Sequence, residues 1–190
     1  MIKATVTDRK WITELLVSSF ADNPSVRYII SGENFRLKRT RALMEYSFDI
    51  CMRFGEVWFL EDLRGCALLL FPHRKRTGLS SVWLDLKFIF RAVGLAGVGR
   101  VMRRERLISQ KQPKVDMVYL WFIGVDPSVQ HAGIGSQLLA EILKRSENLD
   151  LPVYLETSVT SNLSWYEHFG FELYDELDLG YRLHFLRKLN

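Results

Sequence analysis

The stretch Val125-Asp-Pro-Ser-Val-Gln130-His-Ala-Gly133-Ile-Gly135-Ser136 lies between an apolar run, residues 117–125, and a segment with helical spacing, residues 134–146. This order predicts a strand, a turn and the start of a helix. The first N–H groups of a helix have no partner within it, and the helix dipole adds positive charge there. Gly133 and Gly135 allow the backbone to approach a ligand closely. The stretch therefore predicts a binding site for a pyrophosphate group.

Two glycines at a helix start are also typical of a tight loop that binds nothing, so the stretch alone leaves both interpretations open. No Lys followed by Ser or Thr comes after Gly135, which excludes the Walker phosphate-binding pattern. Position 138 is a leucine, whereas the dinucleotide-binding fingerprint requires a third glycine there. The stretch therefore fits neither of these two nucleotide-binding classes.

Three motifs together resemble the GNAT superfamily of N-acetyltransferases. The segment Gln130-His-Ala-Gly-Ile-Gly135 fits the family signature Q/R-x-x-G-x-G/A, and Val125-Asp-Pro127 stands where the family has V-x-P. Val153-Tyr-Leu-Glu-Thr-Ser158 resembles the fifth strand of the family. Asn162-Leu-Ser-Trp-Tyr-Glu-His-Phe-Gly-Phe171 resembles its N-x-x-F/W-Y-x-x-x-G-F segment. The motifs follow one another in the expected order over residues 117–176, whereas the N-terminal part resembles the family only in its order of elements.

Hydrophobic periodicity and turn residues predict the order of the elements. We expect helices over residues 8–20, 35–54, 133–146 and 161–169, a pair of helices within 80–111, and strands over 2–6, 56–61, 65–71, 117–125, 153–157, 171–175 and 181–186. This order matches the α/β (α+β mixed sheet) GNAT fold, with the two strands that flank the 133–146 helix parallel to each other. We therefore expect a single GNAT domain over residues 1–190.

Residues 73–115 are predicted to form a helical insertion between the third and fourth strands of this domain. Simple connections between strands have about two to six residues, and this one is far longer. The segment is too apolar for a disordered loop, and its apolar residues recur at helical spacing. We hypothesise that the insertion forms a lid or wall of the acceptor pocket.

The composition is that of a globular protein: 48% of the 190 residues are apolar, which is enough to fill a core. The two cysteines, Cys51 and Cys66, lie in apolar runs without metal-ligand spacing, so we expect them to pack and expect no metal site. The N-terminus has no apolar core of the length found in signal peptides. No apolar run reaches the ~20 residues that a membrane span needs. We therefore expect a cytoplasmic protein. A net charge of +4 suits an anionic ligand without requiring nucleic acid.

The resemblance implies that acetyl-CoA is the cosubstrate and lies between the parallel strands 117–125 and 153–157, which separate from each other. It implies that Tyr166 is the acid that protonates the leaving thiolate. The alternative for Tyr166 is a packed aromatic residue, and the alternative for Asn162 is a turn or cap residue. The residues expected to contact the coenzyme are Ile123, Gly124, Val125, Gln130, His131, Ala132, Gly133, Ile134, Gly135, Ser136 and Asn162.

The general base cannot be assigned from the sequence. No carboxylate lies within residues 117–125. Glu156 on the neighbouring strand is a candidate base, with a structural role as the alternative. By residue type, His73 and His184 titrate nearest to neutral pH, but we interpret both as surface or packed residues.

The sequence therefore predicts an N-acetyltransferase that transfers an acetyl group from acetyl-CoA to a primary amine by direct attack in a ternary complex. The acceptor, a small molecule or a protein, is not identified. One alternative is a coenzyme A-binding sensor without turnover. Another is a nucleic-acid- or protein-binding module that uses arginine clusters such as residues 100–106. If the protein is not such a module, we interpret these clusters as solvated faces of helices. We expect no nucleic-acid partner and no membrane span, and the oligomeric state stays open between monomer and homodimer.

Overall fold

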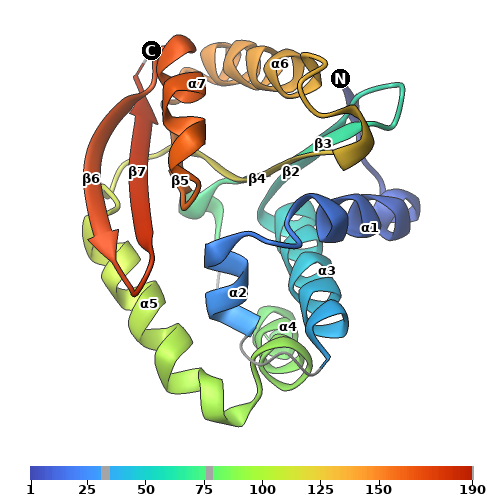
Figure 1. The fold of residues 1–190 in the computed structure, drawn as a ribbon, viewed down its shortest axis with the longest axis vertical. Coiled ribbons are helices and arrows are strands. Elements are labelled where there is room, and N and C mark those ends of the chain that lie inside the picture. The colour runs from blue at the N-terminus through green and yellow to red at the C-terminus, as the bar shows by residue number, and fades with distance from the viewer. Residues whose placement is uncertain (31–34, 76–78, 190) are drawn as a thin grey trace.

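A seven-stranded mixed sheet organises the molecule (Figure 1). The computed structural model describes residues 1–30, 35–75 and 79–189, except for the side chains of residues 79–81. The strand order is β1-β2-β3-β4-β5-β7-β6, and all neighbours are antiparallel except β4 and β5, which are parallel. The strands are β1 (Ile2–Lys3), β2 (Gly55–Phe59), β3 (Gly65–Leu70), β4 (Val118–Val125), β5 (Val153–Thr157), β6 (Glu172–Asp178) and β7 (Arg182–Lys188). The predicted mixed sheet of the GNAT fold is confirmed.

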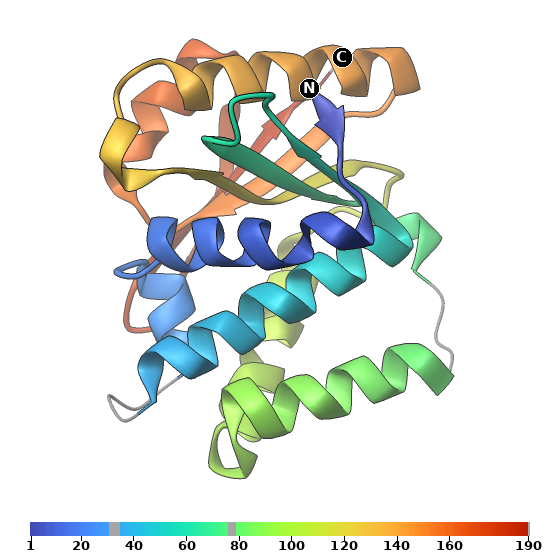
Figure 2. The ribbon, with the colours of Figure 1, turned by 90° about the vertical axis from the view of Figure 1, so that its right-hand side faces the viewer.

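Helices cover both faces of this sheet. Figure 2 shows α6 on one face and α1 and α3 on the other, because each helix packs an apolar stripe onto the sheet. None of the described helices is long and apolar enough to cross a membrane. The helices are α1 (Arg9–Ser19), α2 (Pro24–Ile30), α3 (Arg36–Phe54), α4 (Leu79–Phe88), α5 (Val98–Lys111), α6 (Ile134–Leu149) and α7 (Leu163–His168).

The segment between β3 and β4 contains the two predicted helices, α4 and α5. A π-helical turn, Ile89–Val93, extends α4, and the chain then reverses into α5. The α4 helix packs on α3, while Ile108 of α5 packs against Leu183 and Phe185 of β7. The insertion therefore joins one helical layer to the last hairpin of the sheet, β6 and β7. The assignment of the whole chain to a single domain stays a prediction.

Two local features differ from the sequence-based expectation. The sequence predicts no helix between residues 20 and 35, but a further helix, α2, begins at Pro24. Asn23 Oδ1 accepts a hydrogen bond from the Val26 N–H at 3.1 Å, and Pro24 occupies a position where its missing N–H costs nothing. The helix predicted over residues 161–169 begins at Leu163, because Ser161 lies in a preceding 3-10 turn and Asn162 is the capping residue.

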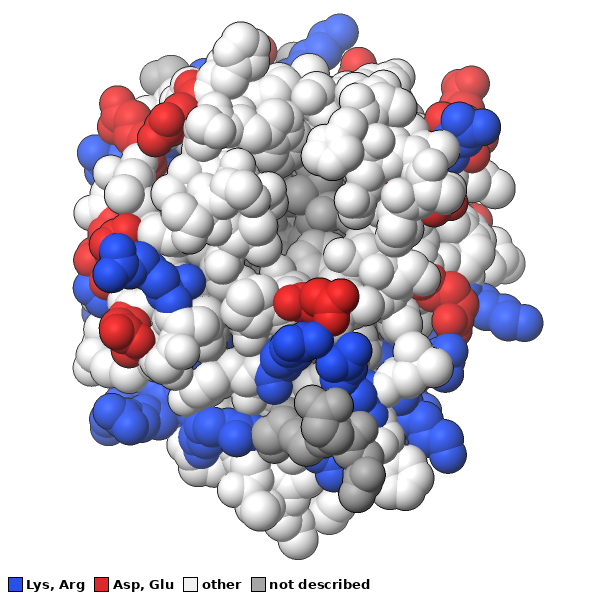
Figure 3. Space-filling view, viewed as in Figure 1, with Lys and Arg blue, Asp and Glu red and all other residues white. Residues whose placement is uncertain are grey.

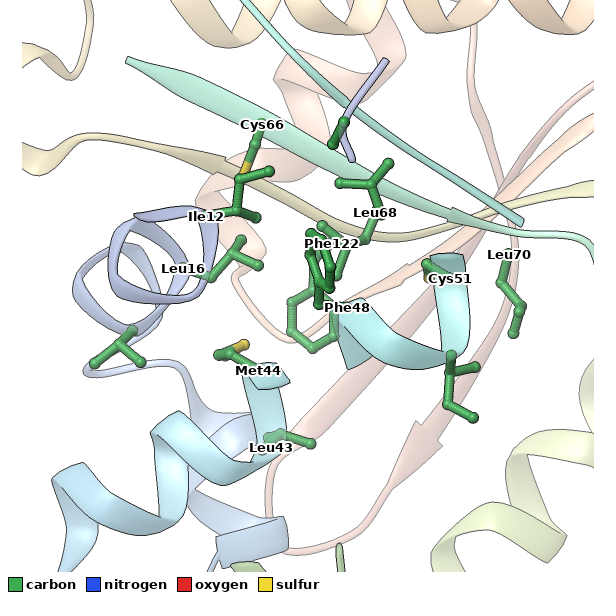
Figure 4. Close-up of a cluster of buried hydrophobic side chains, with 14 of the residues drawn as sticks. Ile12, Leu16, Leu43, Met44, Phe48, Cys51, Cys66, Leu68, Leu70 and Phe122 are labelled. Carbon is green, nitrogen blue, oxygen red and sulfur yellow. The ribbon is translucent and has the colours of Figure 1, made fainter. Parts of the chain in front are cut away.

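The larger core cluster lies between the sheet and the helices α1 and α3. Figure 4 shows Phe48 of α3 beside Phe122 of β4, with Leu16 of α1 and Leu68 of β3 around them. Phe48 is 1% exposed. Its ring fills the centre of the layer that supports β4.

We expect Phe48→Ala to lower the free energy of unfolding by about 3–5 kcal/mol, because it removes a buried ring and leaves a cavity. Urea denaturation measures this loss. Leu37→Ala is the matched control, since Leu37 lies on the same helix with 60% of its surface exposed. Its effect should stay within about 0.5 kcal/mol. Equal losses in the two variants would contradict the position of Phe48 in the core.

Candidate active site

The strands β4 and β5 are paired only at their N-terminal ends. The pairs are Val118 with Val153 and Tyr119 with Tyr154. Both strands continue beyond these pairs, and the other edge of β4 stays paired with β3 as far as Val125. One edge of β4 therefore faces a gap in the sheet. An unpaired strand edge is a binding surface for another extended, amide-bearing group.

A cavity of about 1630 Å³ occupies this gap. Figure 3 shows the molecule hollowed near the centre of the face drawn there. Some lining residues, such as Tyr166, belong to the core layer beneath α6 and α7. Others, such as Tyr46 and Trp121, pack in the layer of α1 and α3. The cavity therefore extends through the sheet between β4 and β5 and has one half on each face.

The half under α6 begins at the turn that leads into this helix. Gly133 is the capping residue, with a left-handed φ of 82°, and His131 before it also has a positive φ, 65°. Asp126 stabilises the preceding turn by accepting hydrogen bonds from the Ser128 N–H at 2.9 Å and from its hydroxyl at 2.8 Å. These bonds lower the pKa of the Asp126 carboxyl. The free N–H groups of the 16-residue helix α6 therefore lie at the wall of the cavity.

Most of the predicted coenzyme contacts come together in this half. Gly124 and Ala132 are not among the described residues that line the cavity. Gly124 faces α1 instead, where an added Cβ would come within 2.8 Å of Leu16 Cδ2. The side chain of Ile134 is 8% exposed and packs with Leu60 and Leu138, so this residue offers mainly its backbone. The predicted residues that line the cavity are Ile123, Val125, Gln130, His131, Gly133, Ile134, Gly135, Ser136 and Asn162.

A hydrogen bond that the sequence does not reveal joins α7 to the start of α6. Trp165 Nε1 donates to Ser136 Oγ at 3.0 Å. The Trp165 ring also lies over Gly135, where an added Cβ would be 3.6 Å from it. The α7 helix is thereby fixed against the start of α6, with the next residue, Tyr166, in the cavity wall.

Tyr166 combines a packed ring with a free hydroxyl. Its ring centroid lies 4.6 Å from that of Trp165 and 5.5 Å from that of Phe171, and the residue is 5% exposed. Among the described residues, its hydroxyl has no hydrogen-bond partner. Burial raises the pKa of the Tyr166 phenol, so the phenol is protonated at neutral pH. The geometry therefore offers a proton donor at the cavity wall.

Glu156 lies on β5 and faces the cavity with both carboxylate oxygens hydrogen-bonded. The Tyr119 hydroxyl donates to Oε2, and Gln112 Nε2 donates to Oε1 at 2.7 Å. Burial raises the pKa of Glu156, although these two hydrogen bonds act in the opposite direction. Gln112 caps the C-terminal end of α5, so the insertion supplies one of the two hydrogen bonds to the Glu156 carboxylate.

The half of the cavity on the α3 face has aromatic walls. Tyr46 stacks on Phe88 with ring centroids 4.4 Å apart and meets Trp121 edge-on at 6.2 Å. The pairing of β3 with β4 contains a β-bulge here, in which Trp121 is the residue of β4 without a partner on β3. Trp121 therefore lies on the same side of the sheet as its neighbour Phe122. The Tyr46 hydroxyl donates to Asp85 Oδ1 at 2.7 Å. The sequence predicts that the insertion contributes to an acceptor pocket, but it does not predict these side chains, because they come from α3, α4 and β4.

Arg104 closes the cavity between α5, α2 and the last hairpin. It is 8% exposed and donates to Ser25 Oγ at 2.7 Å, to Tyr181 Oη at 3.0 Å and to Glu105 Oε1 at 2.5 Å. Burial alone lowers the pKa of Arg104, but Glu105 and Tyr181 outweigh it, so the pKa is raised and the side chain is cationic. The interpretation of the 100–106 cluster as a solvated face is therefore wrong for this residue.

The two histidines lie elsewhere. His184 is 2% exposed, and its Nδ1 lies 2.7 Å from Glu176 Oε1 on the neighbouring strand. Neither His184 nor His73 is among the described residues that line the cavity.

Comparisons with known proteins agree with this fold. Residues 86–173 match the family model of the GNAT acetyltransferase domain. The chain is 28% identical over 179 residues to an uncharacterized N-acetyltransferase of Schizosaccharomyces pombe, covering 86% of this chain and 70% of that protein. The chain is therefore similar to the GNAT acetyltransferase domain over residues 86–173 and to an N-acetyltransferase over most of its length.

Two solved structures illustrate the similarity of fold. The histone acetyltransferase HPA2 and related acetyltransferase from Corynebacterium glutamicum has a TM-score of 0.76 at 21% identity, over 99% of this chain and 94% of that one. The PaiA N-acetyltransferase from Thermoplasma acidophilum, in complex with coenzyme A, has a TM-score of 0.59 at 14% identity. The match covers 100% of this chain and 97% of that one. At these identities the similarity concerns the fold alone.

Proposed function

We propose that the protein transfers the acetyl group of acetyl-CoA to a primary amine by direct attack within a ternary complex. One observation carries this proposal: a single cavity runs between β4 and β5 and connects a helix start on one face with an aromatic half on the other. The thioester and the amine approach each other from these two halves. The free edge of β4 lies where they meet.

The half under α6 suits the coenzyme. The pantetheine arm pairs with the open edge of β4 near Ile123 and Val125, as an added strand would. The pyrophosphate lies at the free N–H groups between Gln130 and Ser136, where the helix dipole favours negative charge. Asn162 is a further contact from the opposite wall. The Thermoplasma protein of the same fold, which binds coenzyme A, supports this choice of cosubstrate.

The proposed transfer uses two side chains of the cavity. The neutral amine attacks the carbonyl carbon of the thioester, and the carbon–sulfur bond breaks. The sulfur leaves with its electron pair and takes a proton from the hydroxyl of Tyr166, while Glu156 accepts the proton that the amine loses. The free phenol of Tyr166 and the raised pKa of Glu156 support these roles.

The half on the α3 face suits an amine with an aromatic or apolar substituent. Tyr46, Phe88 and Trp121 provide apolar walls whose ring faces attract a cation. Among the described residues, Asp85 forms no ion pair, so its carboxylate is available to attract an ammonium group. This half therefore favours arylalkylamines over polyamines or amino acids, whose additional charges would be desolvated against the rings.

The proposed compartment is the cytoplasm. Its support is the state of the two cysteines, Cys51 and Cys66, which are both buried and free. Unpaired cysteines are usual where thiols are kept reduced.

Release of free coenzyme A thiol from acetyl-CoA tests the proposal. We expect an arylalkylamine to accelerate the release most, and a polyamine and an amino acid to accelerate it less. If the protein binds acetyl-CoA and no primary amine accelerates thiol release, the coenzyme-binding sensor replaces the transferase. If the polyamine is the best acceptor, the transferase stands but the assignment of the aromatic half is wrong.

A further inference from the structure

One side of α4 and the turn after it form an exposed apolar surface. Five large apolar residues on this surface are between 43% and 72% exposed; the first four recur at helical spacing, and the fifth lies in the turn that follows. The opposite side of α4, with Leu84 and Phe88, packs on the core of α1 and α3. We call this surface the apolar insertion face; its residues are Val82, Trp83, Leu86, Phe90 and Leu95.

Positive charge is concentrated in the same segment. Residues 73–115 contain eleven Lys and Arg but only two Asp and Glu, whereas the rest of the chain has more acidic than basic residues. Lys87 is exposed at the border of the apolar insertion face, four residues after Trp83 and three before Phe90. Figure 3 shows Lys and Arg beside an uncharged tip at the lower end of the molecule, where α5 begins in Figure 1. The apolar surface is therefore bordered by cations.

We propose that the apolar insertion face docks on an anionic lipid surface. Exposed Trp, Phe and Leu beside Lys and Arg is the composition of helices that lie in the boundary of a membrane. The aromatic and aliphatic side chains enter the acyl boundary while the cations contact anionic headgroups. The helix with its π-helical turn, residues 79–93, is shorter than a membrane span, so it lies on the surface.

The charge of the segment disfavours the other occupants of such a face. A second copy of this chain would bring two strongly basic segments together, and like charges at an interface are repulsive. Nucleic acid satisfies the cations but offers no apolar surface to Phe90 and Leu95, which would stay exposed. A lipid surface satisfies both the charge and the apolar side chains.

Docking would bring one half of the active-site cavity close to the lipid. The same helix that carries Trp83 outward lines that half from its inner side through Asp85 and Phe88. The inference of lipid docking does not depend on the proposed function, because it rests on the outer side of the helix alone.

Cosedimentation with vesicles tests this inference. We expect the full chain to bind vesicles of equal parts phosphatidylcholine and phosphatidylglycerol, to leave them at high salt, and not to bind phosphatidylcholine alone. The double variant Trp83→Ser/Phe90→Ser should lose most of this binding, and Lys87→Gln, which removes one positive charge, should weaken it about fivefold. Leu63→Ser is the matched control, because Leu63 is 51% exposed in the β2–β3 turn at the opposite end of the molecule (Figure 2).

Three results would overturn the inference. The first is no binding to the anionic vesicles at low salt. The second is binding that the double variant retains as fully as the Leu63→Ser control. The third is concentration-dependent self-association that the double variant abolishes, since it would show that a second copy covers the face. Circular dichroism of each variant establishes that it is folded before any binding is compared.

Discussion

Tyr166→Phe should lower kcat about a hundredfold or more and leave the affinity for acetyl-CoA unchanged. The phenylalanine ring keeps the contacts with Trp165 and Phe171, so the wall of the cavity is retained. Only the hydroxyl is lost, and with it the proton for the departing thiolate, an effect of the size usual for general acids. Initial rates of thiol release, together with calorimetric titration of coenzyme A, separate the chemical step from binding.

Tyr154→Phe is the control for this experiment. Tyr154 is also 5% exposed, lies on β5 and is outside the described lining of the cavity. Its replacement should leave kcat unchanged. A kcat that is equal in Tyr166→Phe and wild type would show that Tyr166 is a packing residue, which is the other interpretation of its sequence position.

Glu156→Gln should also reduce kcat/KM by about two orders of magnitude near neutral pH, because the amide cannot accept the amine proton. In the wild-type protein, kcat/KM should fall as the pH drops through the pKa of Glu156, which burial raises above 4.5. The variant should lack this acid limb. A pH–rate profile for both proteins tests the assignment, since a merely structural carboxylate would leave the limb in place.

The same pKa shift predicts a dependence of stability on pH. Because the folded state raises the pKa, the stabilising contribution of Glu156 is complete below the pKa of the unfolded chain. The contribution is lost as the pH rises through the folded-state pKa. The free energy of unfolding of the wild type should therefore fall relative to that of Glu156→Gln over this range.

Glu56→Gln is the control for both experiments on Glu156. Glu56 is also a buried carboxylate, 5% exposed and paired with Arg145 at 2.8 Å, but it lies outside the described lining of the cavity. Its replacement should lower stability and leave the acid limb unchanged.

Local patterns in the sequence predict most of the fold. The β5 strand has the predicted bounds, and α6 begins at the residue after Gly133, because periodicity and turn residues are local signals. The α2 helix is missed because its seven residues, of which the first is a proline, carry too short a pattern to show an apolar face. Its stability depends on packing of Val26 and Ile30 into the core of α1 and α3.

The candidate site is predictable only where one continuous segment builds it. The turn before α6 is such a segment, and the structure brings most of its predicted residues to the cavity. The partners of Glu156 and of Tyr46 come from distant parts of the chain: Gln112 is 44 residues from Glu156, and Asp85 is 39 residues from Tyr46. No local pattern encodes such contacts, because they depend on how α4 and α5 pack against the sheet.

Thermal unfolding with acetyl-CoA tests the central claim most directly, namely that the cavity at the β4–β5 gap binds the coenzyme. At a hundredfold excess over its Kd, a ligand stabilises the native state by about 2.7 kcal/mol, or about 5–10 °C for a chain of this size. Gly133→Val should abolish this shift. Gly180→Val should retain the shift, because Gly180 lies outside the described lining of the cavity. It is a matched control, since its φ of 83° is nearly equal to the 82° of Gly133. A wild-type shift with acetyl-CoA but not with ATP or NAD, lost only in Gly133→Val, is the predicted result. No shift with acetyl-CoA, or an equal shift in both glycine variants, would contradict the claim.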